Sequence, residues 1–147
     1  MLAILDTRKE HLIKDVDKLL ARINILVVDD MEAIRGMIKA TLLDLGAARV
    51  DMAVNGEDAW KKAKHKHYHL IISDWDMPKM TGIEFLLKIR ASDEHKHIPF
   101  LLLTASTEKE RVMAAVKSGV SDYLSKPFQS NQLHLRVLKL LPRVKLD

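Results

Sequence analysis

Five short apolar runs recur along the chain, and a longer stretch with helical spacing of apolar residues follows each one. The runs lie at residues 25–28, 50–54, 70–72, 100–103 and 123–124. Short apolar runs of this kind are typical of strands that are buried on both faces. Strands that alternate with helices form an open parallel sheet with helices on both sides. The sequence therefore predicts an α/β domain with a five-stranded, doubly wound parallel sheet.

Glycine and proline mark where the predicted helices end. The helix after the first run should end at Gly46, and the helix before the fifth run should end at Gly119. Glycine readily adopts the left-handed backbone conformation that commonly terminates a helix. Proline cannot continue a helix, so we expect the last helix to end at Pro142.

Polar residues follow four of the five apolar runs, at the point where each predicted strand ends. Asp29 and Asp30 follow the first run, Asp74 the third, Thr104 the fourth and Lys126 the fifth. In doubly wound sheets the carboxyl ends of the strands form the ligand-binding edge, so these side chains should converge. Clustered carboxylates repel one another, and a hard divalent cation such as Mg²⁺ relieves that repulsion. The set predicts a phosphoryl-transfer site in which a carboxylate is the nucleophile.

Each of these residues also has an ordinary structural interpretation when it is taken alone. An aspartate at a strand-to-helix junction commonly caps the helix, Thr104 could do the same, and Lys126 could be a surface lysine. Polar residues stand at four of the five predicted strand ends, in the order that the site requires. This joint pattern favours one shared functional site over four unrelated structural roles.

Four motifs resemble the signature of the response regulator receiver family, of the CheY-like kind. They are Val27-Val28-Asp29-Asp30, the segment 72–82 (ISDWDMPKMTG), Leu103-Thr104-Ala105 and Lys126-Pro127-Phe128. The resemblance covers about residues 23–141. It implies a flavodoxin-like sheet with strand order 2-1-3-4-5 in a receiver domain at residues 23–143. Residues 1–22 lie outside this domain, and we expect them to form a helical extension.

The resemblance assigns a metal and a phosphoryl group to the site. By analogy with the family, Asp74 accepts the phosphoryl group from a histidine kinase, a phosphotransfer protein or a small phosphodonor. Asp30 and Asp74 would bind Mg²⁺ directly, Asp29 mainly through water, and Asp76 through its backbone carbonyl.

The remaining implied roles concern phosphoryl binding and switching. Thr104 and Lys126 would bind phosphoryl oxygens, the Lys126–Pro127 peptide would be cis, and Tyr123 would be the switch aromatic. The reporting surface would be the receiver's fourth helix, fifth strand and fifth helix, where a downstream effector binds. Such a protein is a signalling switch that catalyses its own phosphorylation and dephosphorylation, and is no enzyme in the usual sense. The lifetime of the phosphoryl group stays open, because Asp76 and Ser106 flank the path of the attacking water.

Two other functions are alternatives. Asp74-Trp75-Asp76 matches the Asp-x-Asp nucleophile motif of haloacid-dehalogenase-type phosphohydrolases. That motif would then lie on the third strand instead of the first, and the Asp29-Asp30 pair would have no role. A scaffold that has lost phosphorylation is the second alternative, and the complete set of site residues argues against it.

The first 22 residues lie outside the receiver pattern. Apolar residues recur there at alternating three- and four-residue steps that are broken only by Lys9. They are Leu2, Leu5, Leu12, Val16, Leu19 and Ile23. Thr7-x-x-Glu10 is a capping-box pattern that predicts a helix starting near Arg8. The helix could pack on its own domain, form a coiled coil that makes a homodimer, or continue a helix from an upstream domain.

Composition excludes several classes. The formal net charge is +4, and Lys and Arg are interleaved with Asp and Glu, so we expect no direct nucleic-acid binding. No apolar run is long enough to span a membrane, and we expect a cytoplasmic protein. Zero cysteines exclude disulfides. Histidines cluster at residues 65–69 and 95–97, where solvated loop histidines or a surface metal site are both options.

Overall fold

The computed structural model describes residues 15–105 and 108–146. The strands are β1 (Asn24–Val28), β2 (Arg49–Ala53), β3 (Leu70–Asp74), β4 (Phe100–Thr104) and β5 (Asp122–Ser125). The helices are α2 (Glu32–Leu45), α3 (Gly56–His65), α4 (Gly82–Ala91), α5 (Lys109–Lys117) and α6 (Ser130–Leu140), with a 3-10 turn η1 (Leu141–Arg143) after α6. Residues 15–22 are also helical. Among the described residues, no helix combines the length and apolar character needed to cross a membrane.

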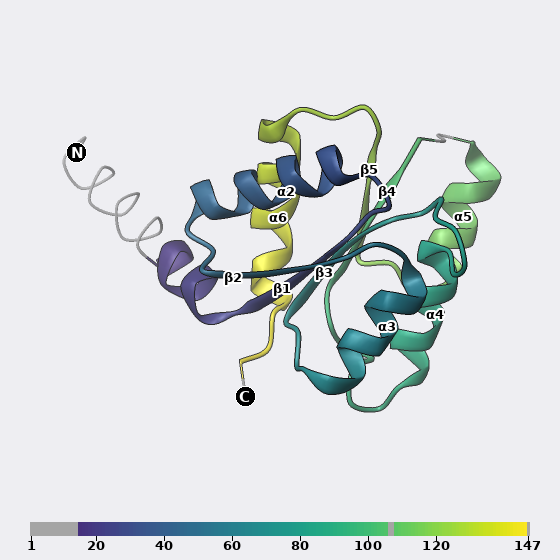
Figure 1. Ribbon diagram of the computed structural model, residues 1–147, viewed down its shortest axis with the longest axis horizontal. Helices are drawn as coiled ribbons and strands as arrows, with labels where there is room; N and C mark the ends of the chain where they lie inside the picture. Colours follow the sequence, from purple (N-terminus) through teal and green to yellow (C-terminus); the bar gives the residue numbers. More distant parts are fainter. Residues whose placement is uncertain (1–14, 106–107, 147) are drawn as a thin grey trace, which may run out of the picture.

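The five strands form one parallel sheet in the order β2-β1-β3-β4-β5, which confirms the predicted fold and strand order. Helices α2 and α6 cover one face, and α3, α4 and α5 cover the other (Figure 1). The register aligns Val28 with Ser73 and Asp74 with Leu103, so the carboxyl ends of the central strands lie side by side. The predicted site residues lie at this edge, because each one ends its strand or comes just after it.

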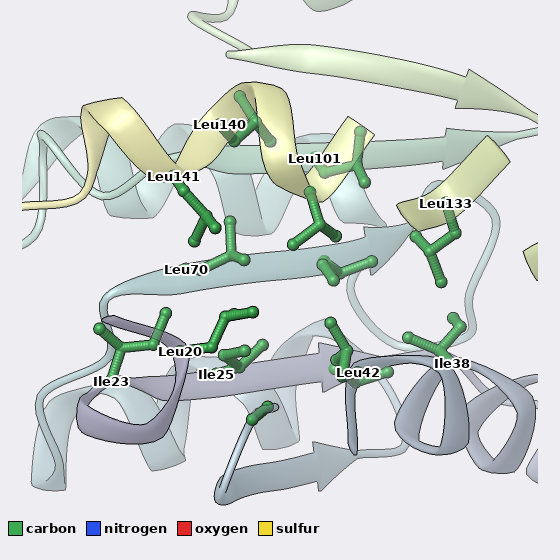
Figure 2. Packing of buried hydrophobic residues seen from close by; sticks show 14 of the residues in the cluster. Leu20, Ile23, Ile25, Ile38, Leu42, Leu70, Leu101, Leu133, Leu140 and Leu141 are labelled. Carbon is green, nitrogen blue, oxygen red and sulfur yellow. The ribbon is translucent and has the colours of Figure 1, made fainter. Parts of the chain in front are cut away.

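Alternate strand residues pack beneath α2 and α6 in the first of two cores. Figure 2 shows Ile25, Leu70 and Leu101 from the sheet pointing toward the helices of this face. Their partners from the helices are fully or almost fully buried and include Ile38, Leu42, Leu133, Leu140 and Leu141. Full burial of one such side chain stabilises the fold by about 1.5–3 kcal/mol.

The residues in between face the second core, beneath α3, α4 and α5. Leu26, Ile71 and Leu102 are fully buried there, and the rings of Phe85 and Phe100 lie 5.6 Å apart. Both faces of the central strands are therefore buried, which explains their uninterrupted apolar sequence. Edge strand β2 is covered less completely. Apolar and polar residues alternate along its sequence, as expected for a strand that is only partly buried.

The described part of the amino-terminal extension packs on its own domain. Leu20 and Ile23 are fully buried in the first core, and Val16 and Leu19 are partly buried against it. The capping-box pattern and the earlier leucines lie outside the described residues. A coiled coil formed by the extension stays a prediction.

The helix ends largely follow the sequence. Gly46 (φ 115°) and Gly119 (φ 89°) adopt the left-handed conformation just beyond α2 and α5, as predicted. Pro142 lies inside the 3-10 turn η1, so α6 itself ends at Leu140. The tighter turn still buries Leu141 in the first core.

Arg90 joins the carboxyl end of α4 to the segments that lead into β4 and β5. Its guanidinium donates to the backbone carbonyls of Gly119 (2.7 Å), Lys96 (2.9 Å) and Ile98 (2.7 Å), and to the hydroxyl of Ser121 (3.3 Å). One side chain thus satisfies three backbone acceptors at the end of the sheet opposite Asp74.

Candidate phosphoacceptor site

Three aspartates converge at the carboxyl edge of the sheet. Asp29 and Asp30 follow β1, and Asp74 is the last residue of β3. One carboxylate oxygen from each lies within 4.8 Å of those of the other two. Asp29 is fully buried, Asp74 is 6% exposed, and Asp30 is exposed, so the cluster opens to solvent on the Asp30 side. The structure brings together the three carboxylates that the sequence predicted.

Lys126, directly after β5, reaches into this cluster. Its ammonium lies 2.9 Å from Asp29 Oδ2 and 3.2 Å from Asp74 Oδ1. One ammonium cannot balance three carboxylates, so ionised side chains leave the cluster with a net negative charge. Closely spaced oxygen ligands with excess negative charge and access to solvent fit a hard divalent cation such as Mg²⁺.

The surroundings shift the pKa of both partners of the Asp74–Lys126 pair. Burial raises the pKa of Asp74 and the nearby Asp29 charge raises it further, while Lys126 acts in the opposite direction. Burial alone would lower the pKa of Lys126, but the hydrogen bond and charge of Asp29, together with the charge of Asp74, hold it above its usual value. Lys126 is therefore a permanent positive charge in the site.

Backbone hydrogen bonds fix the two buried carboxylates. Asp74 Oδ1 accepts the N–H of Trp75 at 2.9 Å, and Asp29 Oδ1 accepts the N–H of Met31 at 2.9 Å. Arg35 also donates to the backbone carbonyl of Asp29 at 2.8 Å. Carboxylates held in this way lose little further freedom when a ligand binds, which is the preorganisation that phosphoryl transfer requires.

Thr104 and Tyr123 lie where the sequence predicted them. Thr104, the last residue of β4, is 2% exposed, and its backbone carbonyl accepts the N–H of Lys126 at 2.7 Å. The Lys126–Pro127 peptide is cis, as expected. Tyr123 is half-buried against the second core. Its role as a switch stays a prediction.

Gly82, the first residue of α4, is a site residue whose role the sequence did not reveal. Its N–H donates to the carbonyl of Trp75 at 2.9 Å. A Cβ at this position would collide with the carbonyl oxygen of Asp74 and would lie 3.0 Å from the Asp74 carbonyl carbon and from Trp75 Cα. Only glycine lets α4 begin this close to the backbone of Asp74. The sequence feature that could have indicated this role is the position of Gly82 at the end of the 72–82 motif.

Arg111 on α5 is a second residue that the sequence did not predict. It forms a two-point ion pair with the Asp76 carboxylate, with distances of 2.8 and 3.1 Å. Its guanidinium carbon lies 4.5 Å from the centre of the Trp75 ring. The two partners are 35 residues apart in the sequence, and no motif linked them.

The histidines separate into different environments. His67, His69 and His97 line one small pocket with Tyr68, whereas His95 is buried, with Nε2 3.0 Å from the carbonyl of Ala63. Among the described residues, the group whose ligand atoms are close enough to hold a metal is the aspartate cluster. The hypothesis of a surface histidine metal site therefore gains no support.

Comparison with known proteins gives consistent matches. The sequence model of the family described as "Response regulator receiver domain" matches residues 25–138. Chemotaxis protein CheY-3 of Vibrio cholerae is 37% identical over 120 residues, which cover 82% of this chain and 92% of that protein. The solved structure of chemotaxis response regulator CheY4 of Vibrio cholerae is 37% identical with a TM-score of 0.74, covering 81% of this chain and 98% of that one.

A further solved structure concerns the metal. It is the receiver domain of a sensor histidine kinase from Pseudomonas aeruginosa, solved with a magnesium ion coordinated in its active site cleft. It is 28% identical with a TM-score of 0.74, and the match covers 82% of this chain and 98% of that one. All these matches cover most of the chain and nearly the whole of each relative.

Proposed function

This chain belongs to the response regulator receiver family, and we propose that it accepts a phosphoryl group on Asp74 with Mg²⁺ and thereby switches a partner-binding surface. Receivers of this family are signalling proteins of two-component systems. The observation that carries the proposal is the aspartate cluster with the Lys126 ammonium between Asp29 and Asp74. Within the described part of the chain, no comparable feature favours a haloacid-dehalogenase-type hydrolase, because Asp76 in its Asp-x-Asp motif is paired with Arg111.

Four aspartates would hold the cation. Asp30 and Asp74 would bind it directly, Asp29 through water and Asp76 through its backbone carbonyl. Bound Mg²⁺ would supply positive charge that neutralises phosphoryl oxygens and orients them for in-line transfer. The close spacing of three carboxylates supports this assignment. The magnesium-containing Pseudomonas receiver with the same fold is a second, independent support.

Asp74 would be the nucleophile in phosphorylation. A carboxylate oxygen forms a bond to phosphorus while the phosphorus–nitrogen bond of a phosphohistidine breaks, and the leaving imidazole takes up a proton. Lys126 and the Thr104 hydroxyl would bind the oxygens of the transferred group. In dephosphorylation a water oxygen bonds to phosphorus, and the electron pair of the broken phosphorus–oxygen bond returns to the Asp74 carboxylate. The group leaves as inorganic phosphate, and the water proton passes to that phosphate or to solvent. The phosphodonor and the water are the co-reactants, and in both steps the catalytic groups would be the chain's own residues and the cation, which would make the steps self-catalysed.

The donor would be a histidine kinase or a phosphotransfer protein. An apolar groove beside Lys126, lined by Met31, Ile34, Met37 and Phe128 among others, offers a docking surface next to the acceptor. The negative charge added to Asp74 would draw Thr104 inward, and Tyr123 would follow into the vacated space. A downstream effector would read the change on the α5–β5–α6 face.

This assignment places the receiver at residues 23–143 and the extension at residues 1–22, and it implies action in the cytoplasm. The exposed apolar side chains Met113, Val116 and Leu135 on α5 and α6 support an effector-binding role for the α5–β5–α6 face. A homodimer, through this face or through the extension, stays a prediction.

The test is intact mass after incubation with acetyl phosphate and Mg²⁺. One added phosphoryl group on the wild type is expected, with none on Asp74→Asn and none when the cation is chelated. A phosphoryl adduct on the Asp74→Asn variant would show that the acceptor is a residue other than Asp74. An unmodified wild type, with beryllofluoride also failing to change Trp75 fluorescence, would leave a scaffold without phosphorylation as the better function.

A further inference from the structure

Arg111 connects helix α5 to the loop after β3 through a two-point contact. Both terminal nitrogens of its guanidinium bond to different oxygens of the Asp76 carboxylate, and the same group stacks on the Trp75 ring. A planar fork with two hydrogen bonds and an aromatic partner restricts the orientation of both side chains far more than a single ion pair does. The contact therefore fixes where the Asp76 carboxylate points.

The pair contributes little to the stability of the fold. Asp76 is 58% and Arg111 35% exposed at the side chain, and exposed ion pairs are worth little in water. Its importance is in its position, because Asp76 follows Asp74 by two residues. The Arg111 hydrogen bonds lower the pKa of Asp76, as does the Lys126 charge.

The carboxylates near the acceptor thus form two groups. Asp29 and Asp74 pair with Lys126. The ligand oxygens of Asp29, Asp30 and Asp74 are close enough for one cation. Asp76 has its own counter-ion. Without Arg111 its charge would be uncompensated beside an acceptor that must receive a phosphoryl group with two negative charges.

We propose that Arg111 is a positioning residue for phosphoryl transfer, which holds the Asp76 carboxylate away from the aspartate cluster and neutralises its charge. This inference rests on the proposed function of the site. Loss of Arg111 has two opposite consequences. The site binds a divalent cation more tightly, because a fourth carboxylate now attracts it. The site takes up a phosphoryl group more slowly, because the same carboxylate repels the donor.

The first experiment is a Mg²⁺ titration followed by Trp75 fluorescence, in a Trp60→Phe background so that one tryptophan reports. Arg111→Ala should lower the Mg²⁺ dissociation constant about three- to tenfold at low salt, and high salt should reduce the difference. Arg111→Lys, which keeps the charge without the fork, should restore part of the wild-type value. Lys117→Ala removes a charge from the exposed far end of α5 and should leave the dissociation constant unchanged.

The decisive comparison is a double-mutant cycle with Asp76→Asn. Arg111→Ala should have no effect on Mg²⁺ affinity when residue 76 carries no charge, because Arg111 then has nothing to neutralise. At saturating Mg²⁺, modification by acetyl phosphate should slow about threefold in Arg111→Ala and return to the rate of Asp76→Asn in the double variant.

An equal effect of Arg111→Ala in both backgrounds would overturn the inference, and so would an unchanged or weaker Mg²⁺ affinity. The failure of the proposed function looks different. The proposed function would fail if the wild type bound Mg²⁺ but took up no phosphoryl group. In that case the Mg²⁺ titration would still decide the role of Arg111. A chain in which no variant responds to Mg²⁺ would overturn both.

Discussion

One substitution, glycine to alanine, should have opposite effects on stability at Gly82 and at Gly36. At Gly82 an added methyl group meets backbone atoms of Asp74 and Trp75, which no side-chain rotation can move aside. At Gly36, in the interior of α2, no atom other than those of its chain neighbours and the surrounding helix backbone lies within 4 Å of the added methyl group. The pair separates the steric requirement of the site from the general preference of helices for alanine.

The magnitudes follow from these two environments. Forcing a methyl group into packed surroundings destabilises a fold by about 1–3 kcal/mol, and a rigid backbone obstacle puts Gly82→Ala at the upper end. The helix preference for alanine, about 1 kcal/mol, offsets part of this, so the free energy of unfolding should fall by about 2 kcal/mol. Gly36→Ala has only the helix preference and should raise it by about 0.5–1 kcal/mol.

Urea unfolding measures both effects. With a slope of about 2 kcal/mol per molar urea, the midpoint should move down by about 1 M for Gly82→Ala and up by about 0.4 M for Gly36→Ala. The strain at Gly82 acts on the backbone of Asp74, so phosphoryl uptake should also fall in that variant and stay unchanged in Gly36→Ala. A Gly82→Ala protein as stable as the wild type would refute the claim that α4 needs this close approach.

Three further outcomes are expected. Without a divalent cation at pH 7, Asp74→Asn should be more stable than the wild type, because the folded state raises the pKa of Asp74 and so disfavours its charged form. That difference should shrink as the pH falls through the raised pKa and vanish below the ordinary value of 3.8, and urea unfolding at several pH values checks it. Tyr68→Phe removes a 2.7 Å hydrogen bond to Asp51 and should lower the free energy of unfolding by about 1 kcal/mol; no change in the urea midpoint would mean that water replaces the bond. Leu20→Ala should cost about 2–4 kcal/mol because Leu20 is fully buried in the first core, whereas the exposed Lys18→Ala should stay within about 0.5 kcal/mol; equal thermal midpoints would show that the extension does not pack.

The fold was predictable because its determinants are local and repeated. Residues 70–72 and 100–103 carry strand patterns that need no knowledge of distant residues, and parallel packing then fixes which strand ends meet. Asp29, Asp74 and Lys126 could be identified for the same reason, since Asp74 ends its strand and the other two directly follow theirs. Parallel pairing in the sheet brings strand ends that are far apart in the sequence close together in space.

The unpredicted features depend on contacts between side chains or backbone segments far apart in the sequence. Arg111 lies on a helix whose own pattern gives no reason to face Asp76, and the pairing depends on how α5 sits on the sheet. The need for glycine at position 82 depends on the distance between α4 and the end of β3. The last helix was predicted to end at Pro142, and α6 does end just before it, at Leu140. The unpredicted feature is the 3-10 turn η1, which accommodates Pro142 because the missing N–H of proline is tolerated in a first turn.

Helix α5 is held at its two ends by interactions of different kinds. At its carboxyl end, Arg90 binds the carbonyl of Gly119, and these hydrogen bonds do not depend on the charge state of the distant site. At its amino end, Arg111 is held by the charge of Asp76, next to the acceptor. Charge added at the acceptor would therefore act on one end of the helix only. The mechanical result is a pivot: α5 would rotate about its Gly119 end, and the displacement of each residue would grow with its distance from that end.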